Sequence, residues 1–249
     1  EPLAPLLIIL VLFYRTMNTL MLAQAQWQQV MHLAGGLNIV TEEYEEVQSH
    51  QEKSGKTVLP SFNQSLQFKN TSFAFEETQV IRGVSFTIPK NATVALVGES
   101  GSGKTTLTDL MSLLLKPQGG QILFDGIPAD KLDLASWRKK IGFVTQDTVI
   151  FDDTIANNIA VGEDYVDKRK LSHAVDVANI KEYIESLPLS YNTKIGMEGL
   201  GLSTGQKQRL LIARAVYKNP DYLFLDEATN ALDAHNKKMI MENLNRFFK

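Results

Sequence analysis

The chain contains no cysteine among its 249 residues. This absence excludes disulfide bridges, thiolate metal sites and cysteine nucleophiles, and it suits a reducing compartment. An excess of basic residues is also lacking, because 25 Lys and Arg stand against 28 Asp and Glu, a net charge of −3. Proteins that bind nucleic acid usually carry a basic field, so we expect no nucleic-acid partner. The hydrophobic share of 44% is ordinary for a folded chain and argues against overall disorder.

Charged and helix-breaking residues are both missing from a long stretch near the start of the chain. No Asp, Glu, Lys or Arg occurs at residues 16–41, and no Pro occurs at residues 6–59. This pattern favours a long helix that runs out of a bilayer into water, with Gly35 and Gly36 expected to kink or end it. A second, polar helix is expected near residues 41–47. The whole net charge falls in the first 56 residues, where six acids stand against three bases.

Residues 3–14 form an apolar run, LAPLLIILVLFY. A helix that spans the hydrocarbon core needs about 20 apolar residues, so this run is expected to be the C-terminal part of a transmembrane helix. The alternative is a buried core helix. A signal peptide is disfavoured because no basic region precedes the run and no small-residue cleavage site follows it. We expect residues 1–50 to hold the end of a transmembrane helix with its cytosolic extension, and residues 51–64 to form a linker.

The pattern changes from about residue 57 onward. Residues 65–75 and 80–88 alternate between apolar and polar side chains, which is typical of half-buried strands. The stretch from residue 154 to 216 is predicted to be mostly helical. Short apolar runs that indicate further strands, several of them buried and parallel, lie at residues 93–97, 121–124, 141–144 and 222–225. Strands that alternate with helices predict an α/β domain with a parallel sheet.

The strongest motif is GESGSGKT, which matches the phosphate-binding P-loop pattern G-x-x-x-x-G-K-[ST]. Glycines allow the backbone to turn tightly so that successive N–H groups converge on phosphate oxygens, and the following helix adds its N-terminal dipole. Lys104 supplies a positive charge toward the outer phosphates, and the Thr105 hydroxyl suits Mg²⁺. A chance match is disfavoured because an apolar run precedes the motif and a helical pattern follows. The predicted phosphate-binding residues are Gly98, Glu99, Ser100, Gly101, Ser102, Gly103, Lys104, Thr105 and Thr106.

Two carboxylates follow the apolar run YLFL, namely Asp226 and Glu227. Side chains alternate along a strand, so the two acids are expected to point in different directions and to take different roles. Asp226 is predicted to hold the Mg²⁺ shell, and Glu227 to orient and deprotonate an attacking water. The pattern is weak by itself and becomes strong in a chain that also carries a P-loop.

A third motif is LSTGQ, which begins at Leu202 and is followed by the basic, helical stretch KQRLLIARAV. A Ser and a Gly at the start of a helix indicate a second anion site at a helix N-terminus. The alternative is a plain N-cap by Ser203.

Together these motifs resemble the nucleotide-binding domain of ATP-binding cassette (ABC) proteins. Gln146 matches the Q-loop, LSTGQ the ABC signature, YLFLDE the Walker B strand, and Asp233 the D-loop. Phe75 lies where this family has an aromatic residue that stacks on adenine. The resemblance covers residues 65–249 and implies a parallel-sheet core, an antiparallel β subdomain and a helical subdomain.

The resemblance implies an ATPase that binds ATP and Mg²⁺ between two subunits. Its catalytic residues would be Glu227, Gln146 and Lys104, and its metal-binding residues Thr105, Gln146 and Asp226. The signature residues Ser203, Thr204, Gly205 and Gln206 would contact ATP bound by the opposite subunit, and Asp233 would couple the two sites. Gln146 would also sense the transmembrane domain.

An apolar segment fused to a cassette resembles the arrangement of ABC exporters. This implies a second ABC subunit, in a homodimer or a heterodimer, and a transmembrane domain. The cassette would lie on the cytoplasmic face of a bacterial inner or plasma membrane. The signature region is most similar to peptide or bacteriocin exporters, with multidrug and lipid exporters as rivals. A soluble ABC ATPase and a non-hydrolysing partner in a heterodimer are the alternatives.

The sequence departs from the family pattern at two points. Thr204 replaces the usual middle glycine of the signature, and we expect function to survive this change. None of the four His residues matches the switch His that the family carries on the core strand after the catalytic Glu. His235 is expected to be an exposed surface residue. Because the first residue is Glu1 rather than Met, we expect a cut or processed chain. Because the switch His and the last core strands of the family are missing, we expect the cassette to continue beyond Lys249 and this chain to hydrolyse ATP poorly on its own.

Overall fold

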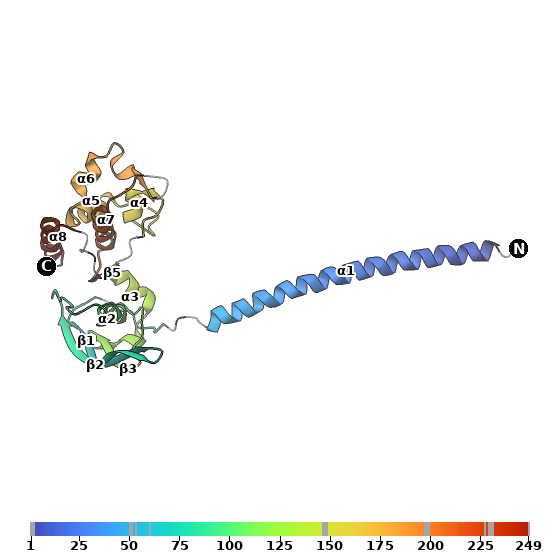
Figure 1. The fold of residues 1–249 in the computed structure, drawn as a ribbon, viewed down its shortest axis with the longest axis horizontal. Helices are drawn as coiled ribbons and strands as arrows, with labels where there is room; N and C mark the ends of the chain where they lie inside the picture. Colours follow the sequence, from blue (N-terminus) through green and yellow to red (C-terminus); the bar gives the residue numbers. More distant parts are fainter. Residues whose placement is uncertain are drawn as a thin grey trace. The chain divides into compact units, whose positions relative to one another are not determined.

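The computed structural model describes residues 3–49, 52, 54–59, 61–145, 149–196, 200–226, 228 and 232–248. The chain divides into two compact units, Glu1–Lys53 and Ser54–Lys249. The first unit contains a single long helix, and the second, which we call the cassette, contains the remaining elements (Figure 1).

Helix α1 extends over Leu3–Ser49 without interruption. The expectation that Gly35 and Gly36 end the helix is therefore wrong, and residues 41–47 belong to the same helix. A glycine inside a helix costs about 1 kcal/mol relative to alanine, which is less than the cost of starting a new helix. No proline lies near these glycines to stop the helix.

The apolar side chains of α1 are exposed on all sides of the helix. Leu6, Leu10 and Leu20 are each more than 60% exposed. The helix is long and apolar enough to cross a membrane, and its most apolar window has a mean hydropathy of 1.9 with none of it buried. Burial of apolar surface is worth about 25 cal/mol per Å², so a helix of this kind needs an apolar environment. Within the first unit, α1 is the one element that the described residues form, so no other element of that unit covers these side chains.

An antiparallel sheet forms one side of the cassette, with the strand order β2-β1-β3-β4. Leu66 of β1 lies opposite Ile88 of β2 and opposite Phe124 of β3. The strands are β1 (Ser65–Phe75), β2 (Thr78–Pro89), β3 (Gly119–Phe124) and β4 (Ile127–Pro128). This sheet confirms the antiparallel β subdomain that the family resemblance implies.

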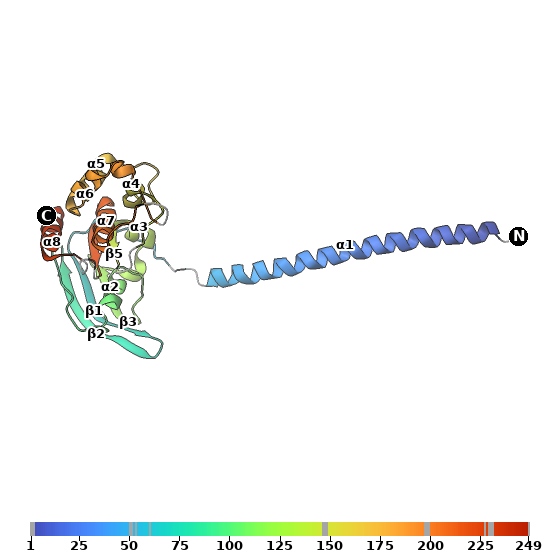
Figure 2. The ribbon, with the colours of Figure 1, turned by 45° about the horizontal axis from the view of Figure 1, so that its top comes forward.

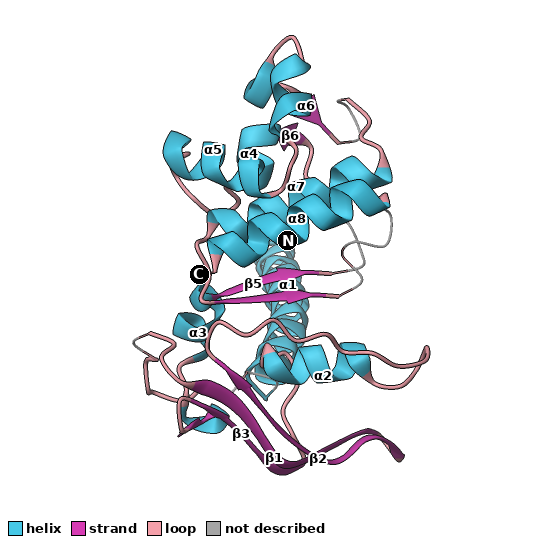
Figure 3. Ribbon diagram, turned by 90° about the vertical axis from the view of Figure 1, so that its left-hand side faces the viewer, coloured by secondary structure: helices cyan, strands magenta, loops and turns pink. Residues whose placement is uncertain are grey.

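A parallel pair, β5 (Ile141–Val144) and β8 (Tyr222–Leu225), lies between two layers (Figure 3). The antiparallel sheet with α2 (Lys104–Met111) lies on one side, and α7 (Thr204–Tyr217) and α8 (Ala234–Phe247) lie on the other. These two strands confirm the predicted parallel sheet. The predicted strand at residues 93–97 is wrong, because these residues join no ladder and Val97 is 93% exposed. An apolar run indicates a side-chain preference for burial, but a strand also needs a neighbour for its backbone hydrogen bonds, and neither β5 nor β8 pairs with this segment.

Helices make up most of the cassette after β5, as the sequence predicts (Figure 2). The short strands β6 (Asp153–Thr154) and β7 (Lys194–Ile195) pair antiparallel beside them. Earlier in the chain lie α2 (Lys104–Met111), the 3₁₀ helix η1 (Ala129–Lys131) and α3 (Leu134–Lys140). The later helices are α4 (Ile155–Ile159), α5 (Lys168–Val177), α6 (Lys181–Ser186), η2 (Ser190–Asn192), α7 (Thr204–Tyr217) and α8 (Ala234–Phe247).

Two hydrophobic cores hold the cassette together. The first contains Phe124 and Trp137, whose rings are 4.1 Å apart, and joins the antiparallel sheet to α2 and α3. Trp137 is fully buried and its indole Nε1–H donates to the carbonyl of Ser112, so its role is in packing. The second core joins helices α4, α5, α7 and α8 and contains Ile155 and Ile240.

The first residues of the cassette are bound to the segment between η1 and α3. The amide of Gly55 donates to the carbonyl of Leu132, and that of Thr57 donates to the carbonyl of Lys131. The Ser54 hydroxyl accepts from the amide of Leu134, and Leu59 is buried. Residues 54–59 of the predicted linker therefore pack against the cassette instead of extending freely from it.

Replacement of Gly55 by alanine is expected to release this segment. A Cβ at Gly55 would overlap the carbonyl group of Lys131, which is backbone and cannot rotate away. We expect Gly55→Ala to lower the free energy of unfolding by about 1–3 kcal/mol in chemical denaturation. Gly201→Ala is the control, because a Cβ there would meet no atom within 4 Å. Equal losses at the two positions would contradict the account.

Candidate functional site

The loop before α2 has a backbone that requires glycine. Gly101 and Gly103 have φ of +79° and +88°, a region that other residues rarely adopt. A Cβ at Gly103 would also lie 3.0 Å from side-chain carbons of Val80 and Ile81. A Cβ at Gly98 would lie 2.6 Å from the hydroxyl of Ser102. The shape of the loop thus needs glycine at Gly101 and Gly103, while at Gly98 a side chain would require the Ser102 hydroxyl to move.

Lys104, the first residue of α2, lies over this loop. Its Nζ donates to the carbonyl of Gly98 at 3.0 Å and to that of Glu99 at 2.7 Å. The first amides of a helix have no partner within the helix, and they bind anions together with the helix dipole. The ammonium group and the N-terminus of α2 therefore offer positive charge at the same place. Residues 98–102 and Thr105 are exposed, whereas Thr106 is buried.

Asp226 follows β8 directly, and its amide donates to the carbonyl of Val144 in β5. The pKa of Asp109, in α2, is raised, first by burial and then by the negative charge of Asp226. This electrostatic interaction shows that the carboxyl end of β8 faces the helix that carries Lys104. The structure thus brings together the P-loop helix and the predicted metal-binding Asp226.

Among the described residues no group of three or more His, Cys, Asp or Glu residues could hold a metal ion. A site for Mg²⁺ that uses one carboxylate, one hydroxyl and phosphate oxygens needs no such group. Asp226 and Thr105 supply oxygens of the required kind.

Gln146 and Glu227 lie outside the described residues. The roles predicted for Gln146 and Glu227 therefore stay predictions. Their neighbours in the chain are informative, because Val144 pairs with Leu225 at the ends of two parallel strands. Parallel strands present their carboxyl ends at one edge of the sheet.

The signature motif forms the start of α7. The Ser203 hydroxyl accepts from the amide of Gln206 at 3.3 Å, and the Gln206 side chain accepts from the amide of Ser203 at 2.8 Å. This reciprocal capping box shows that Ser203 is an N-cap, as the simpler alternative held. Ser203 and Thr204 are also exposed at a helix N-terminus, so the cap leaves an anion-binding role open.

Thr204 is the first residue of α7, and its backbone φ is not positive. A side chain at this position therefore meets no backbone strain, which explains how the chain accepts threonine where the family usually has glycine.

Asp233 caps the N-terminus of α8. Its carboxylate accepts from the amide of Asn236 at 2.8 Å and from the Asn236 side chain at 2.7 Å. These hydrogen bonds lower the pKa of Asp233. His235 is exposed, as the sequence predicts. The predicted coupling role of Asp233 toward a second subunit is not visible in one chain and stays a prediction.

Phe75 is the last residue of β1 and its side chain is 50% exposed. Its ring makes an edge contact with Phe73, with 4.9 Å between the centroids. An exposed, braced aromatic ring suits stacking on a planar base.

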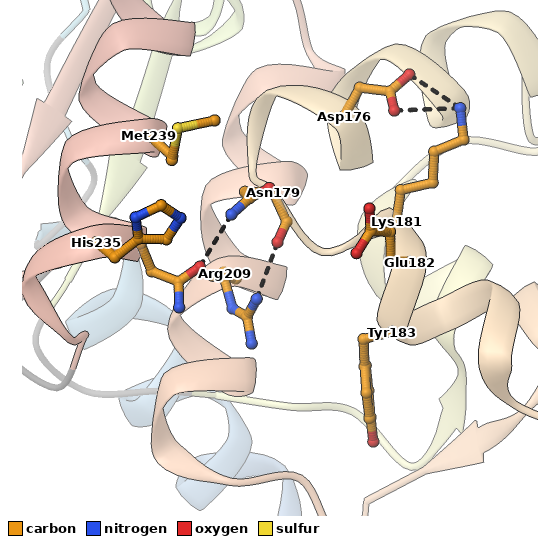
Figure 4. A pocket seen from close by; sticks show the side chains of 9 residues that line it. Asp176, Asn179, Lys181, Glu182, Tyr183, Arg209, His235 and Met239 are labelled. Carbon is orange, nitrogen blue, oxygen red and sulfur yellow. Dashed lines mark hydrogen bonds and ion pairs between the residues drawn. The ribbon is translucent and has the colours of Figure 1, made fainter.

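A cavity of about 580 Å³ lies near α8 (Figure 4), and none of the sequence motifs predicted it. Its lining includes Asn179, Arg209 and His235, which come from three separate parts of the chain. The one local signal is an asparagine placed after the end of α5, a position that favours left-handed backbone.

Replacement of Thr204 by glycine tests whether the threonine is strained. Because Thr204 has ordinary helical geometry, Thr204→Gly is expected to change the free energy of unfolding by no more than about 0.5 kcal/mol, the difference in helix propensity. A clear rise in stability, such as the relief of a positive φ provides, would contradict the geometry.

Replacement of Asp109 by asparagine tests whether the ionisation of this half-buried carboxyl, whose pKa burial and the charge of Asp226 raise, destabilises the fold. A raised pKa in the folded state means that stability is lost as pH rises from the unfolded value of about 3.9 to the folded value. Asp109→Asn should therefore increase the free energy of unfolding at pH 7 and have little effect near pH 3. Chemical denaturation at the two pH values measures this difference. An equal effect at both would exclude ionisation as the cause.

Comparison with known proteins agrees with this geometry. The ABC transporter family model matches residues 81–230. The chain is 42% identical over 191 residues to an ATP-dependent lipid A-core flippase of Syntrophus aciditrophicus, covering 77% of this chain and 32% of that protein. It is 40% identical over 192 residues to ABC transporter B family member 21 of Arabidopsis thaliana, covering 76% of this chain and 15% of that protein.

A solved structure of a bacterial Atm1-family ABC exporter with ATP bound has a similar fold. The TM-score is 0.80 at 35% sequence identity, over 86% of this chain and 38% of that chain. The present chain spans about a third or less of the length of the curated relatives named above. The family match covers more than half of the chain, and the chain belongs to the ABC transporter family.

Proposed function

We propose that this chain is the ATP-binding and ATP-hydrolysing part of an ABC exporter, which couples ATP hydrolysis to efflux of a substrate across a membrane. The observation that carries this proposal is the presence, in one chain, of an exposed apolar helix long enough to cross a membrane and a P-loop cassette. A soluble ABC ATPase does not need an exposed apolar helix such as α1.

In this function the P-loop binds the phosphates of ATP. The loop amides and the N-terminus of α2 hold phosphate oxygens, and Lys104 leaves its two carbonyl partners to neutralise their charge. Thr105 and Asp226 would hold Mg²⁺, which screens the phosphate charge when bound. Phe75 would stack on the adenine base. Glu227, which follows Asp226, would take a proton from the attacking water.

A second ABC subunit would complete each ATP site. The exposed N-terminus of α7, with Ser203, Thr204, Gly205 and Gln206, is proposed to contact ATP that is bound to the P-loop of the partner. A homodimer is the simplest arrangement, and a heterodimer with a different ABC subunit is the alternative. The cassette would lie on the cytoplasmic face, because ATP is available there.

The cargo would be a peptide, a lipid or a drug-like molecule. Similarity to lipid A-core flippases favours a lipid. The peptide branch, which the signature region favours, has no representative among the relatives named above.

Replacement of Glu227 by glutamine tests the hydrolytic function. In the full-length protein, Glu227→Gln is expected to lower the rate of ATP turnover by at least about 100-fold, because the general base is lost, while ATP binding is retained. Glu163→Gln, at an exposed position, is the control and should leave both unchanged. Unchanged turnover in Glu227→Gln would overturn the role of Glu227. No turnover in the unaltered protein would favour a non-hydrolysing partner.

A further inference from the structure

Asn179 has an unusual backbone conformation at the turn between α5 and α6. Its φ is +52°, in the left-handed region, where asparagine and glycine are the residues that fit best. Glycine would satisfy the backbone equally well. The asparagine side chain makes an additional hydrogen bond, because its Nδ2 donates to Oδ1 of Asn236 in α8 at 2.9 Å.

Asn179 also contacts the helix of the signature motif. Nη1 of Arg209 donates to the backbone carbonyl of Asn179 at 2.9 Å (Figure 4). Arg209 lies in α7, one turn after Gly205, and its Nε donates to the carbonyl of Gly205 at 3.4 Å. The turn that contains Asn179 is therefore joined to the signature helix through its backbone and to α8 through its side chain.

The chain of hydrogen bonds continues from α8 to Asp233. Asn236 accepts from Asn179 with its oxygen and donates to Asp233 with its nitrogen, at 2.7 Å. Both ends of the Asn236 amide are thus engaged, so its orientation is fixed. The series links a cation, Arg209, through the backbone and the side chain of Asn179 to an anion, Asp233.

Two other charged groups of this cavity pair with each other. Asp176 and Lys181 form an ion pair at 3.1 Å. Asp176 therefore neutralises Lys181, while Arg209 is directed at the Asn179 and Gly205 carbonyls.

We propose that Asn179 is a positioning residue that fixes Asp233 relative to the signature helix α7. The proposal rests on the proposed ATPase function, in which both motifs act across the subunit interface. The P-loop and Phe75 hold ATP within one subunit, so they determine its affinity. The signature and Asp233 act only when two subunits close on ATP. Loss of the Asn179 side chain therefore lowers the rate of turnover more than the affinity for ATP.

The test is Asn179→Gly in the full-length protein. Glycine retains the left-handed backbone and the carbonyl that accepts from Arg209, and it removes only the amide that binds Asn236. We expect kcat for ATP hydrolysis to fall by about three- to tenfold, with KM for ATP changed by less than about twofold. Asn236→Ala should have a similar effect, and the double variant should fall no further than either single variant.

Asn243→Ala is the matched control. Asn243 also lies in α8, and its side-chain amide donates to the carbonyls of Asp176 and Val177 at 3.3 and 3.2 Å. This variant removes a contact of the same chemistry between α8 and the end of α5. The contact that it removes does not involve Asn236 or Asp233. It should leave kcat unchanged. An equal fall of kcat in Asn243→Ala, or native kcat in Asn179→Gly, would overturn the proposal.

A second measurement is independent of ATP turnover. Amide hydrogen exchange should become faster at residues 233–238 in Asn179→Gly and stay unchanged there in Asn243→Ala. Only the first variant removes the hydrogen bond that holds Oδ1 of Asn236. Unchanged exchange in Asn179→Gly would overturn the positioning role even if the unaltered protein hydrolyses no ATP. Faster exchange together with absent ATP turnover in the unaltered protein would support the positioning role and contradict only the proposed function.

Discussion

Strand β8 is shared by two hydrophobic cores, and its four residues alternate between them. Tyr222 and Phe224 belong to the core of the antiparallel sheet, whereas Leu223 and Leu225 pack against the core of the helices. Its parallel partner β5 behaves in the same way, since Phe143 packs against the first core and Val144 belongs to the second. This alternation follows from the period of two in a strand. The pair thereby separates the cores and holds them in register.

The position of Asp226 depends on this arrangement. Strand β8 ends at Leu225, the last of its residues that pack into the two cores. The next residue is Asp226, whose negative charge contributes to the raised pKa of Asp109 in α2. Helix α2 is itself anchored in the first core by Leu110 and Met111. The helix that carries Lys104 and the strand that carries Asp226 are therefore fixed by one core. The signature helix α7 is fixed by the other, and the hydrogen bonds through Asn179 join it to α8.

The sequence predicted those features that depend on neighbouring residues. The P-loop glycines and the cap at Ser203 are local, because the geometry that needs them lies within a few residues. The strand expected at residues 93–97 failed because a strand depends on a distant partner. The contact of Gly55 with Lys131 and the hydrogen bonds of Asn179 also join distant segments. Periodicity and motif spacing carry no information about such contacts.

The proposed metal site beside the P-loop provides the most direct test of the account. Mn²⁺ can replace Mg²⁺ as a spectroscopic probe, and its binding to the full-length protein with ATP can be followed by electron paramagnetic resonance. Asp226→Asn should weaken Mn²⁺ binding by at least about tenfold, since a charged ligand is lost. Asp221→Asn, at the opposite end of β8, should leave it unchanged, because Asp221 pairs with Lys140. Equal Mn²⁺ affinity in the two variants would contradict the placement of the metal site at the carboxyl end of β8.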